Sequence, residues 1–292
     1  MKNLKTINEF WGAVIRRDMS SAVREEDKFH NKKELKEYLK REIEKQGENV
    51  AIKNLDVSGI EDLGNLFKGL LDGVKTLDLS GWNTEGVKDM KSMFARHSIK
   101  SLNLSGWNTS DVEDTREMFY YCSRLQSLNL SGWNTSSVIN VNSMFQCCTS
   151  LQSLDLSGWD ASSIIDTNSM FHGCKNLQSI DLSGWNTKNV EDMSFMFSGC
   201  LNLKSIIFPD WNTSSVTNML YMFKDCYNLR SLDLSGWDVE NVIYMGFMFD
   251  DCYKLKSLDL TGWDISNVKD VFDMFRNCPA PYKVVKNKIV KI

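Results

Sequence analysis

Residues 125–150, LQSLNLSGWNTSSVINVNSMFQCCTS, carry a pattern that recurs along most of the 292-residue chain. Close copies follow one another every 25 or 26 residues, and a tryptophan marks each of them: Trp82, Trp107, Trp133, Trp159, Trp185, Trp211, Trp237 and Trp263. Self-similarity at such a period is typical of a solenoid, in which each repeat buries its apolar side against its neighbours. The sequence therefore predicts one solenoid of about nine units, the first of them a degenerate copy at residues 55–59.

Each repeat is predicted to contain a short strand and a short helix. Residues 127–131 alternate polar and apolar side chains, which favours a strand. Val138, Val141, Met144 and Cys148 then recur at the spacing of one helix face, and Thr135 stands where a helix N-cap belongs. We expect an α/β architecture, with parallel strands on the concave face, short helices on the convex face and a cap at each end.

The strand segment fits the leucine-rich-repeat pattern L-x-x-L-x-L at Leu125, Leu128 and Leu130. The longer pattern L-D-L-S-G-W-[ND]-T-S-x-V, followed by M-F-x-x-C-x-x-L, resembles the BspA-like leucine-rich-repeat proteins of bacteria. The resemblance covers about residues 55–278, and residues 31–54 resemble the lead-in helix of that family. It implies a non-enzymatic protein, often a surface protein, that functions in adhesion or protein binding.

Four segments are predicted: an N-terminal arm at 1–30, a helical cap at 31–54, the solenoid at 55–278 and a C-terminal cap at 279–292. Asn31 is a suitable N-cap for a helix over about 32–46, and Gly47 would end it. Residues 284–285 and 289–290 could pair as a small hairpin over the last repeat. Two interpretations of the arm stay open, an ordinary tail or a docking peptide.

Composition and charge exclude some functional classes. The chain has 34 basic and 38 acidic residues, a net charge of −4, which disfavours a strongly basic nucleic-acid binder. No apolar run resembles a signal peptide or a membrane span, and no cysteine near the start could carry a lipid anchor. These features predict a cytoplasmic protein by default, or one on the cell surface if it is exported by another route.

Catalytic and metal-binding motifs are not recognisable in the sequence. Seven of the eight cysteines share one position of the repeat, which predicts a column of buried free thiols rather than disulfides or a zinc site. His97 replaces the cysteine of the first full repeat, so a nucleophilic pair with Cys122 is the one catalytic alternative. We expect no enzyme activity, no cofactor and no bound metal.

Two surfaces are candidates for binding a protein partner. Outward strand positions place Asp155, Asp181, Asp233 and Asp259 on the concave face, where they could bind a partner, form a calcium ladder or simply keep the sheet soluble. On the convex side, helical geometry directs the residue before each Met-Phe pair outward. The aromatic candidates there, with two residues on the flank, are Phe195, Tyr221, Phe247, Tyr227 and Tyr253. They could pack between helices or form an exposed apolar ridge.

The strand of the sixth repeat departs from the others, since Ile206-Ile207-Phe208-Pro209-Asp210 replaces L-D-L-S-G. The leading hypothesis is a non-catalytic protein-interaction module that is monomeric or weakly self-associating, with no nucleic-acid binding and no membrane insertion. The alternatives are a bacterial surface adhesin and a structural or virion-assembly component docked by its N-terminal arm.

Overall fold

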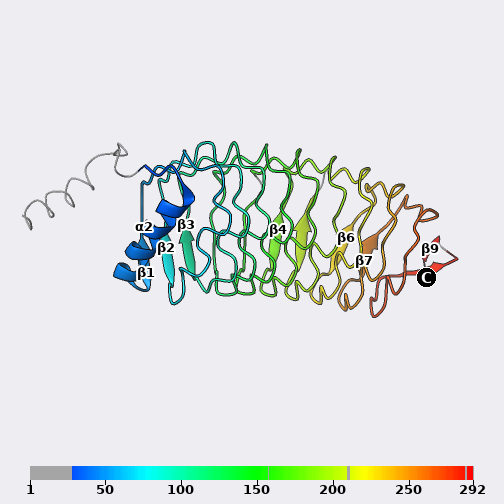
Figure 1. Ribbon diagram of the computed structural model, residues 1–292. Coiled ribbons are helices and arrows are strands. Elements are labelled where there is room, and N and C mark those ends of the chain that lie inside the picture. The colour runs from blue at the N-terminus through cyan, green and yellow to red at the C-terminus, as the bar shows by residue number, and fades with distance from the viewer. Residues whose placement is uncertain (1–27, 157, 209–210, 287, 292) are drawn as a thin grey trace, which may run out of the picture.

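A computed structural model describes residues 28–156, 158–208, 211–286 and 288–291, and it shows an elongated β-solenoid of about eight turns. The coils lie side by side along one axis, from the N-terminal end to the C-terminal end (Figure 1). A helix lies across the first coil and a hairpin follows the last coil. The predicted solenoid is therefore confirmed, with about eight turns in place of the predicted nine units, and each surface consists of columns of residues spaced one repeat apart.

One side of the solenoid, the strand face, carries short parallel strands. They are β1 (Asn49–Ala51), β2 (Thr76–Asp78), β3 (Ser101–Asn103), β4 (Ser179–Asp181), β5 (Ser205–Ile207), β6 (Ser231–Asp233) and β7 (Ser257–Asp259). They pair in register as β1-β2-β3, β4-β5 and β6-β7. Isolated bridges, Ser101 to Ser127 and Asp155 to Asp181, continue the pairing in two of the coils between them.

The register corrects the alignment of the first, degenerate repeat. Ala51 of β1 pairs with Asp78 of β2, so the strand of the first coil lies at residues 49–51. Asp56 instead pairs with Asn83, at the corner that follows the strand. Residues 55–59 resemble the strand motif in letters, but the backbone pairing places them one corner later in the coil.

The predicted convex helices are not present among the described residues, where α2 is the only helix. The segment around each Met-Phe pair forms a series of tight turns. Its N–H groups alternate between two kinds of acceptor: Met144 donates to Val141 O at 3.1 Å, three residues back, whereas Phe145 donates to Met170 O of the next coil at 2.9 Å. The residue before Met also has a left-handed backbone, with φ of 55° at Ser143, which an α-helix does not tolerate.

Asp and Asn side chains shape the corners of the coil. In one repeat, Asn129, Asn134 and Asn140 each accept a hydrogen bond from the backbone N–H two residues later, at 2.8–3.1 Å. This local bond stabilises a turn and competes with helix formation. Thr135, the predicted N-cap, instead donates its hydroxyl to Asp160 O of the next coil at 3.0 Å. Residue types that predicted the start of a helix therefore build corners.

Columns of identical side chains fill the core. Consecutive Phe rings stack, as at Phe119 and Phe145 (5.4 Å, 10°), and so do consecutive Trp rings, as at Trp159 and Trp185 (6.1 Å, 2°). All eight thiols are free, and six of them are buried: Cys122, Cys148, Cys174, Cys200, Cys226 and Cys252. Each buried thiol donates to a Phe carbonyl of the preceding coil at 3.1–3.2 Å. The predicted column of buried thiols is confirmed except at Cys278, its last member, which is only partly buried. In the buried members the sulfur also satisfies a backbone oxygen.

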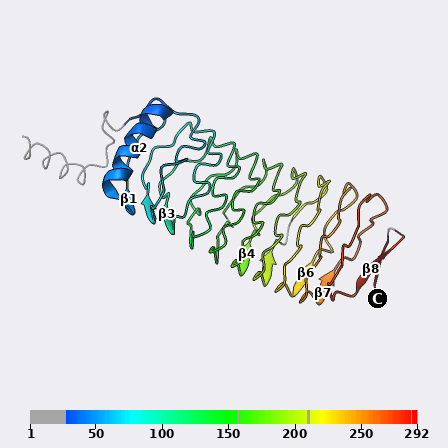
Figure 2. The same ribbon diagram turned by 60° about the horizontal axis from the view of Figure 1, so that its bottom comes forward.

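Both ends of the solenoid are covered (Figure 2). Helix α2 (Lys32–Gln46) begins where Asn31 Oδ1 accepts from Glu34 N–H at 2.9 Å and ends at Gly47, and its buried residues Leu35, Leu39 and Ile43 pack on the first coil. At the other end β8 (Tyr282–Val285) and β9 (Lys288–Lys291) form the predicted antiparallel hairpin. Most of the predicted N-terminal arm, residues 1–27, lies outside the described residues.

Candidate interaction surfaces

Three predicted aromatic residues form one continuous row on the side of the solenoid that carries the tight turns around the Met-Phe pairs. The ring of Phe195 stacks on Tyr221 at 4.6 Å and that of Tyr221 stacks on Phe247 at 4.8 Å. Phe272, which is 64% exposed, meets Phe247 edge-on at 5.2 Å. We call these four residues the aromatic ridge. The first three rings are half-buried against each other, so the ridge is neither packed between helices nor fully exposed.

The ridge residues before each Met have an unfavourable backbone. Phe195, Tyr221 and Phe247 have φ of 57–58°, a left-handed conformation that costs a non-glycine residue roughly 1–2 kcal/mol. Other coils place small or polar residues there, Ser143 and Ser169 among them. An aromatic pair contributes about 0.5–1.5 kcal/mol beyond its buried area, so stacking offsets much of this cost. Phe272 was not predicted from the sequence because the column of residues that precede Met holds Asp273 in this repeat, and Phe272 lies one residue earlier.

The two predicted flanking tyrosines form a separate pair. Tyr227 and Tyr253, 36% and 51% exposed, have ring centroids 5.1 Å apart. The Tyr253 hydroxyl donates to Asp251 Oδ1 at 2.9 Å, which holds its ring along the surface. No ring contact joins this pair to the aromatic ridge in the part of the chain that the structure describes. The structure therefore divides the predicted convex site in two.

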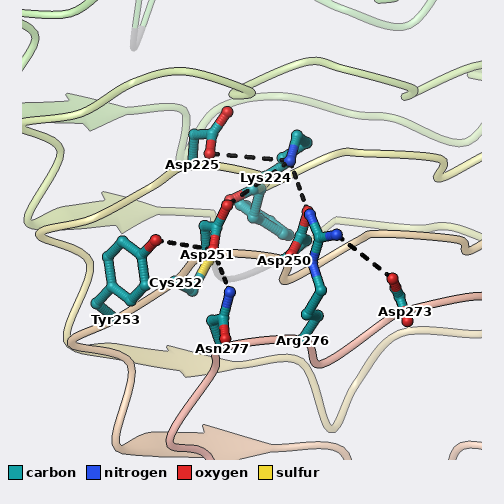
Figure 3. A network of polar contacts seen from close by, with 10 residues as sticks. Lys224, Asp225, Asp250, Asp251, Cys252, Tyr253, Asp273, Arg276 and Asn277 are labelled. Carbon is teal, nitrogen blue, oxygen red and sulfur yellow. Dashed lines mark hydrogen bonds and ion pairs between the residues drawn. The ribbon is translucent and has the colours of Figure 1, made fainter.

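A network of charged residues adjoins Tyr253 of the tyrosine pair (Figure 3). The carboxylate of Asp250 is fully buried and accepts from Lys224 Nζ at 2.5 Å and from Arg276 Nε at 2.7 Å. The Arg276 guanidinium also lies 5.7 Å from the ring centroid of Phe247. This network was not predicted from the sequence. Its three charged residues are spaced by one repeat, and each directly follows the Met-Phe pair of its own repeat.

The same network perturbs Asp225, a partly buried neighbour. Burial raises the pKa of Asp225; the ammonium of Lys224 opposes this, while the carboxylates of Asp251 and Asp250 add to it. Asp251 accepts a hydrogen bond from Asn277 Nδ2 at 2.8 Å, and this bond is the main cause of its lowered pKa. Carboxylates outnumber cations here, so the surface beside the tyrosine pair is acidic.

The predicted acidic residues lie on the strand face. Asp155 and Asp181 are bridge partners in neighbouring coils, and Asp233 of β6 pairs with Asp259 of β7. Between the two pairs the column holds Ile207, which is 51% exposed. A basic column at the preceding corner includes Lys204, Arg230 and Lys256, all exposed. The strand face is therefore mixed in charge rather than uniformly acidic.

A surface hollow of about 950 Å³ opens on the strand face beside the irregular sixth repeat. Its lining combines apolar side chains from Ile207, Phe208 and Trp237 with carboxylates from Asp233 and Asp259. The sequence showed the irregular strand but not that a hollow accompanies it.

The environment of Cys122 and His97, the alternative nucleophilic pair, fits a structural role. Burial raises the pKa of the Cys122 thiol to about 12, and its Sγ donates to Phe94 O at 3.1 Å. Burial also lowers the pKa of His97, against an opposing hydrogen bond with the Phe67 backbone. A protonated thiol that already has an acceptor is a poor nucleophile. Within the described residues, no cluster of three His, Cys, Asp or Glu could hold a metal ion, and no helix could span a membrane.

Comparisons with known proteins give one family match. The family described as "Mycoplasma protein of unknown function, DUF285" matches three overlapping segments, 18–153, 98–207 and 177–287. A search of curated proteins finds no match.

Among solved structures, the chain is similar to TLR13 from a TLR13–ssRNA13 complex, at 18% sequence identity and a TM-score of 0.34. The match covers 70% of this chain and 35% of TLR13. It is also similar to a leucine-rich-repeat protein of Leptospira interrogans, at 15% sequence identity and a TM-score of 0.35. That match covers 85% of this chain and 60% of the Leptospira protein. A leucine-rich-repeat protein of Bacteroides ovatus matches at 14% sequence identity and a TM-score of 0.33, over 77% of this chain and 70% of that protein. The chain spans well under two thirds of TLR13 and 60% of the Leptospira protein. The solenoid is established by its own backbone pairing and not by these likenesses.

Proposed function

The chain belongs to the DUF285 family of Mycoplasma proteins, whose function is unknown, and from this starting point we propose that it is a non-catalytic protein-interaction module. The aromatic ridge is the surface that we assign to the partner. The strand face with Asp155, Asp181, Asp233 and Asp259 is a second surface for the same partner or another one.

The observation that carries this proposal is the continuity of the ridge across consecutive coils. Its rings are 4.6–5.2 Å apart and end at Phe272, whose ring is largely in solvent. Aromatic side chains are enriched at protein interfaces and often dominate their energetics. Rings that are already fixed by stacking lose little conformational entropy on binding.

The experiment is an affinity purification with cross-linking from bacteria that produce the protein, with the full chain as bait. The ridge variant combines Tyr221→Glu and Phe272→Asp. Glu117 and Asp273 occupy the column of Tyr221 in other coils, so that substitution suits the backbone. The matched control is Ile165→Glu, because Ile165 is 41% exposed away from the ridge and Glu191 follows it in the same column.

A partner that the wild type and the Ile165→Glu control retain, and that the ridge variant loses, would support the proposal. Equal capture by all three proteins would remove the ridge from the interface. Circular dichroism of each variant checks that the solenoid is folded.

A surface adhesin is the second candidate, and the repeat motif favours it. The residues L-D-L-S-G-W and M-F-x-x-C-x-x-L resemble the BspA-like proteins, many of which are surface proteins. This candidate requires export, so labelling of intact cells with an antibody to the solenoid tests it. Labelling only after lysis would contradict it. The proposal of a structural component docked by residues 1–30 rests on the sequence alone.

A further inference from the structure

The hollow on the strand face coincides with an interruption of the polar column that runs from Asp78 to Asp259. Outward strand positions hold Asp or Asn in seven repeats: Asp78, Asn103, Asn129, Asp155, Asp181, Asp233 and Asp259. The sixth repeat places Ile207 there, and its side chain is 51% exposed beside Asp233 in the next coil. An exposed apolar side chain between Asp181 and Asp233, with Asp259 one coil further on, makes this part of the face different from the rest.

The two carboxylates of the hollow are only partly engaged. Asp233 Oδ1 accepts from the N–H and the hydroxyl of Ser235 at 3.1 and 2.7 Å. Asp259 Oδ1 accepts from the N–H and the hydroxyl of Thr261 at 2.9 and 2.6 Å. Among the described residues, no ammonium or guanidinium group forms an ion pair with either carboxylate, although the hydrogen bonds of Thr261, and with them the charge of Lys291, lower the pKa of Asp259. Each aspartate therefore turns one oxygen to its own corner and keeps the other for solvent or a ligand.

The same column shows how such an aspartate receives a cation. Asp78 Oδ1 accepts from Ser80 N–H at 3.0 Å, as in the hollow, and its Oδ2 lies 2.9 Å from the ammonium of Lys53. Lys53 comes from the preceding coil, so its side chain runs along the solenoid axis to reach the carboxylate. In the hollow, the preceding coil places Ile207 beside Asp233, and the exposed Lys204 of that coil donates instead to Gln178 Oε1 at 3.0 Å, away from the carboxylate.

We propose that the hollow binds a basic side chain, Arg or Lys, from an extended segment of a protein partner. Its aliphatic stem lies on Ile207, and its charged head lies between Asp233 and Asp259. Neighbouring parallel strands are about 4.8 Å apart, so one head group can meet both carboxylates. Long basic side chains bury their stems on apolar surface while the charge stays near its partner. The inference rests on the proposed function and names the chemistry of the partner at the second surface.

The test is fluorescence anisotropy of a labelled decapeptide of alternating Arg and Ser, with the full chain at low salt. Two peptide controls separate the contributions: citrulline in place of Arg keeps the stem without the charge, and diaminopropionate keeps a charge on a short stem. The protein variants are Ile207→Asp, which restores the residue of other repeats, and the double variant Asp233→Asn with Asp259→Asn. Asp155→Asn is the matched control outside the hollow.

We expect the double variant to bind the Arg peptide about tenfold more weakly, since two ion pairs are lost. Ile207→Asp should weaken binding about threefold to fivefold although it adds a negative charge, because the stem loses its apolar contact. Both control peptides should bind more weakly than the Arg peptide. Asp155→Asn should leave the affinity within about twofold of wild type.

Tighter binding by Ile207→Asp would overturn the proposal, because the peptide would then sense only net charge. An equal loss in Asp155→Asn would have the same meaning. Absence of binding to wild type would also overturn it, while the ridge experiment above would still decide whether the protein is an interaction module.

Discussion

The rings of Tyr221 and Phe247 stack 4.8 Å apart and within 7° of parallel, although both residues have a left-handed backbone with φ of 58°. The relationship follows from the repeat. Equivalent residues adopt the same backbone angles in successive coils, so their side chains leave the surface in the same direction, one coil apart. The period of the sequence therefore decides which side chains become neighbours, even at positions whose left-handed backbone belongs to neither a helix nor a strand.

Glycines with a left-handed backbone should resist substitution. Gly199 has φ of 72°, and a Cβ there would lie 3.4 Å from the backbone of Gly173. Gly199→Ala should lower the free energy of unfolding by about 1–2 kcal/mol. Gly236 has an ordinary φ and open space around it, so Gly236→Ala is the control and should change little. Urea unfolding followed by circular dichroism measures both, and equal midpoints would contradict the prediction.

The buried carboxylate of Asp250 should be important for stability. Asp250→Ala leaves the partly exposed side chains of Lys224 and Arg276 without their shared anion, so we expect a loss of about 1–3 kcal/mol. A triple variant, Lys224→Met, Asp250→Leu and Arg276→Met, removes all three charges and should recover most of the loss. Chemical denaturation of both proteins decides the point. A triple variant as unstable as the single one would show that packing, and not the unpaired charge, is responsible.

Stability at neutral pH should improve when Asp166 becomes Asn. Burial raises the pKa of Asp166, with a further contribution from the Asp192 carboxylate, against opposing hydrogen bonds from Asn168 and Asn142. A raised pKa in the folded state means that folding disfavours the ionised form, so the wild type gains stability as the pH falls through that pKa. Asn140 and Asn218 occupy the same column, so the amide fits the corner.

The stability advantage of Asp166→Asn should therefore be present at pH 7, should decrease as the pH falls through the raised pKa of Asp166, and should be lost below about pH 4, the pKa of an ordinary aspartate in the unfolded chain. Urea midpoints at the two pH values measure it. An advantage that is constant with pH would show that the charge of Asp166 is not its cause.

Thiol reactivity should divide the cysteines into two classes. Cys147 and Cys278 are partly exposed, whereas the six thiols of the core column are buried. Burial raises the pKa of Cys278 as well as that of Cys148 and its equivalents, so the classes differ in access to the reagent. Native protein should react with a disulfide reagent at two sites and denatured protein at all eight. Rapid reaction of Cys122 in the native state would contradict this and would reopen the question of a nucleophile.

The sequence predicted the solenoid, the helix at 32–46 and the C-terminal hairpin because each depends on local spacing or on the period. It predicted a helix around Val138 and Met144 wrongly. Apolar spacing shows which side chains face inward, but it does not show whether an N–H bonds to its own segment or to the next coil. The signal that was available is the residue type at the left-handed positions, which include Gly173, Gly199 and Asn277.

The surfaces were predictable in part, for a similar reason. Columns such as Phe195, Tyr221 and Phe247 follow directly from the period. Contacts between columns do not, because they depend on how each turn directs its side chains. Phe272 joins the ridge from a neighbouring column, and Arg276 reaches both Asp250 and the face of Phe247.

Bonding from coil to coil also sets the increment in which this surface can change in length. A duplicated segment of 26 residues would insert one more coil, extend the ridge by one ring and leave every later column in place. A change of one residue is taken up inside a single coil, because the strands of neighbouring coils pair in register although the pairs Asn49–Thr76 and Thr76–Ser101 are not separated by the same number of residues. Growth and loss by whole repeats are therefore the changes that alter the length of the ridge, in steps of one coil.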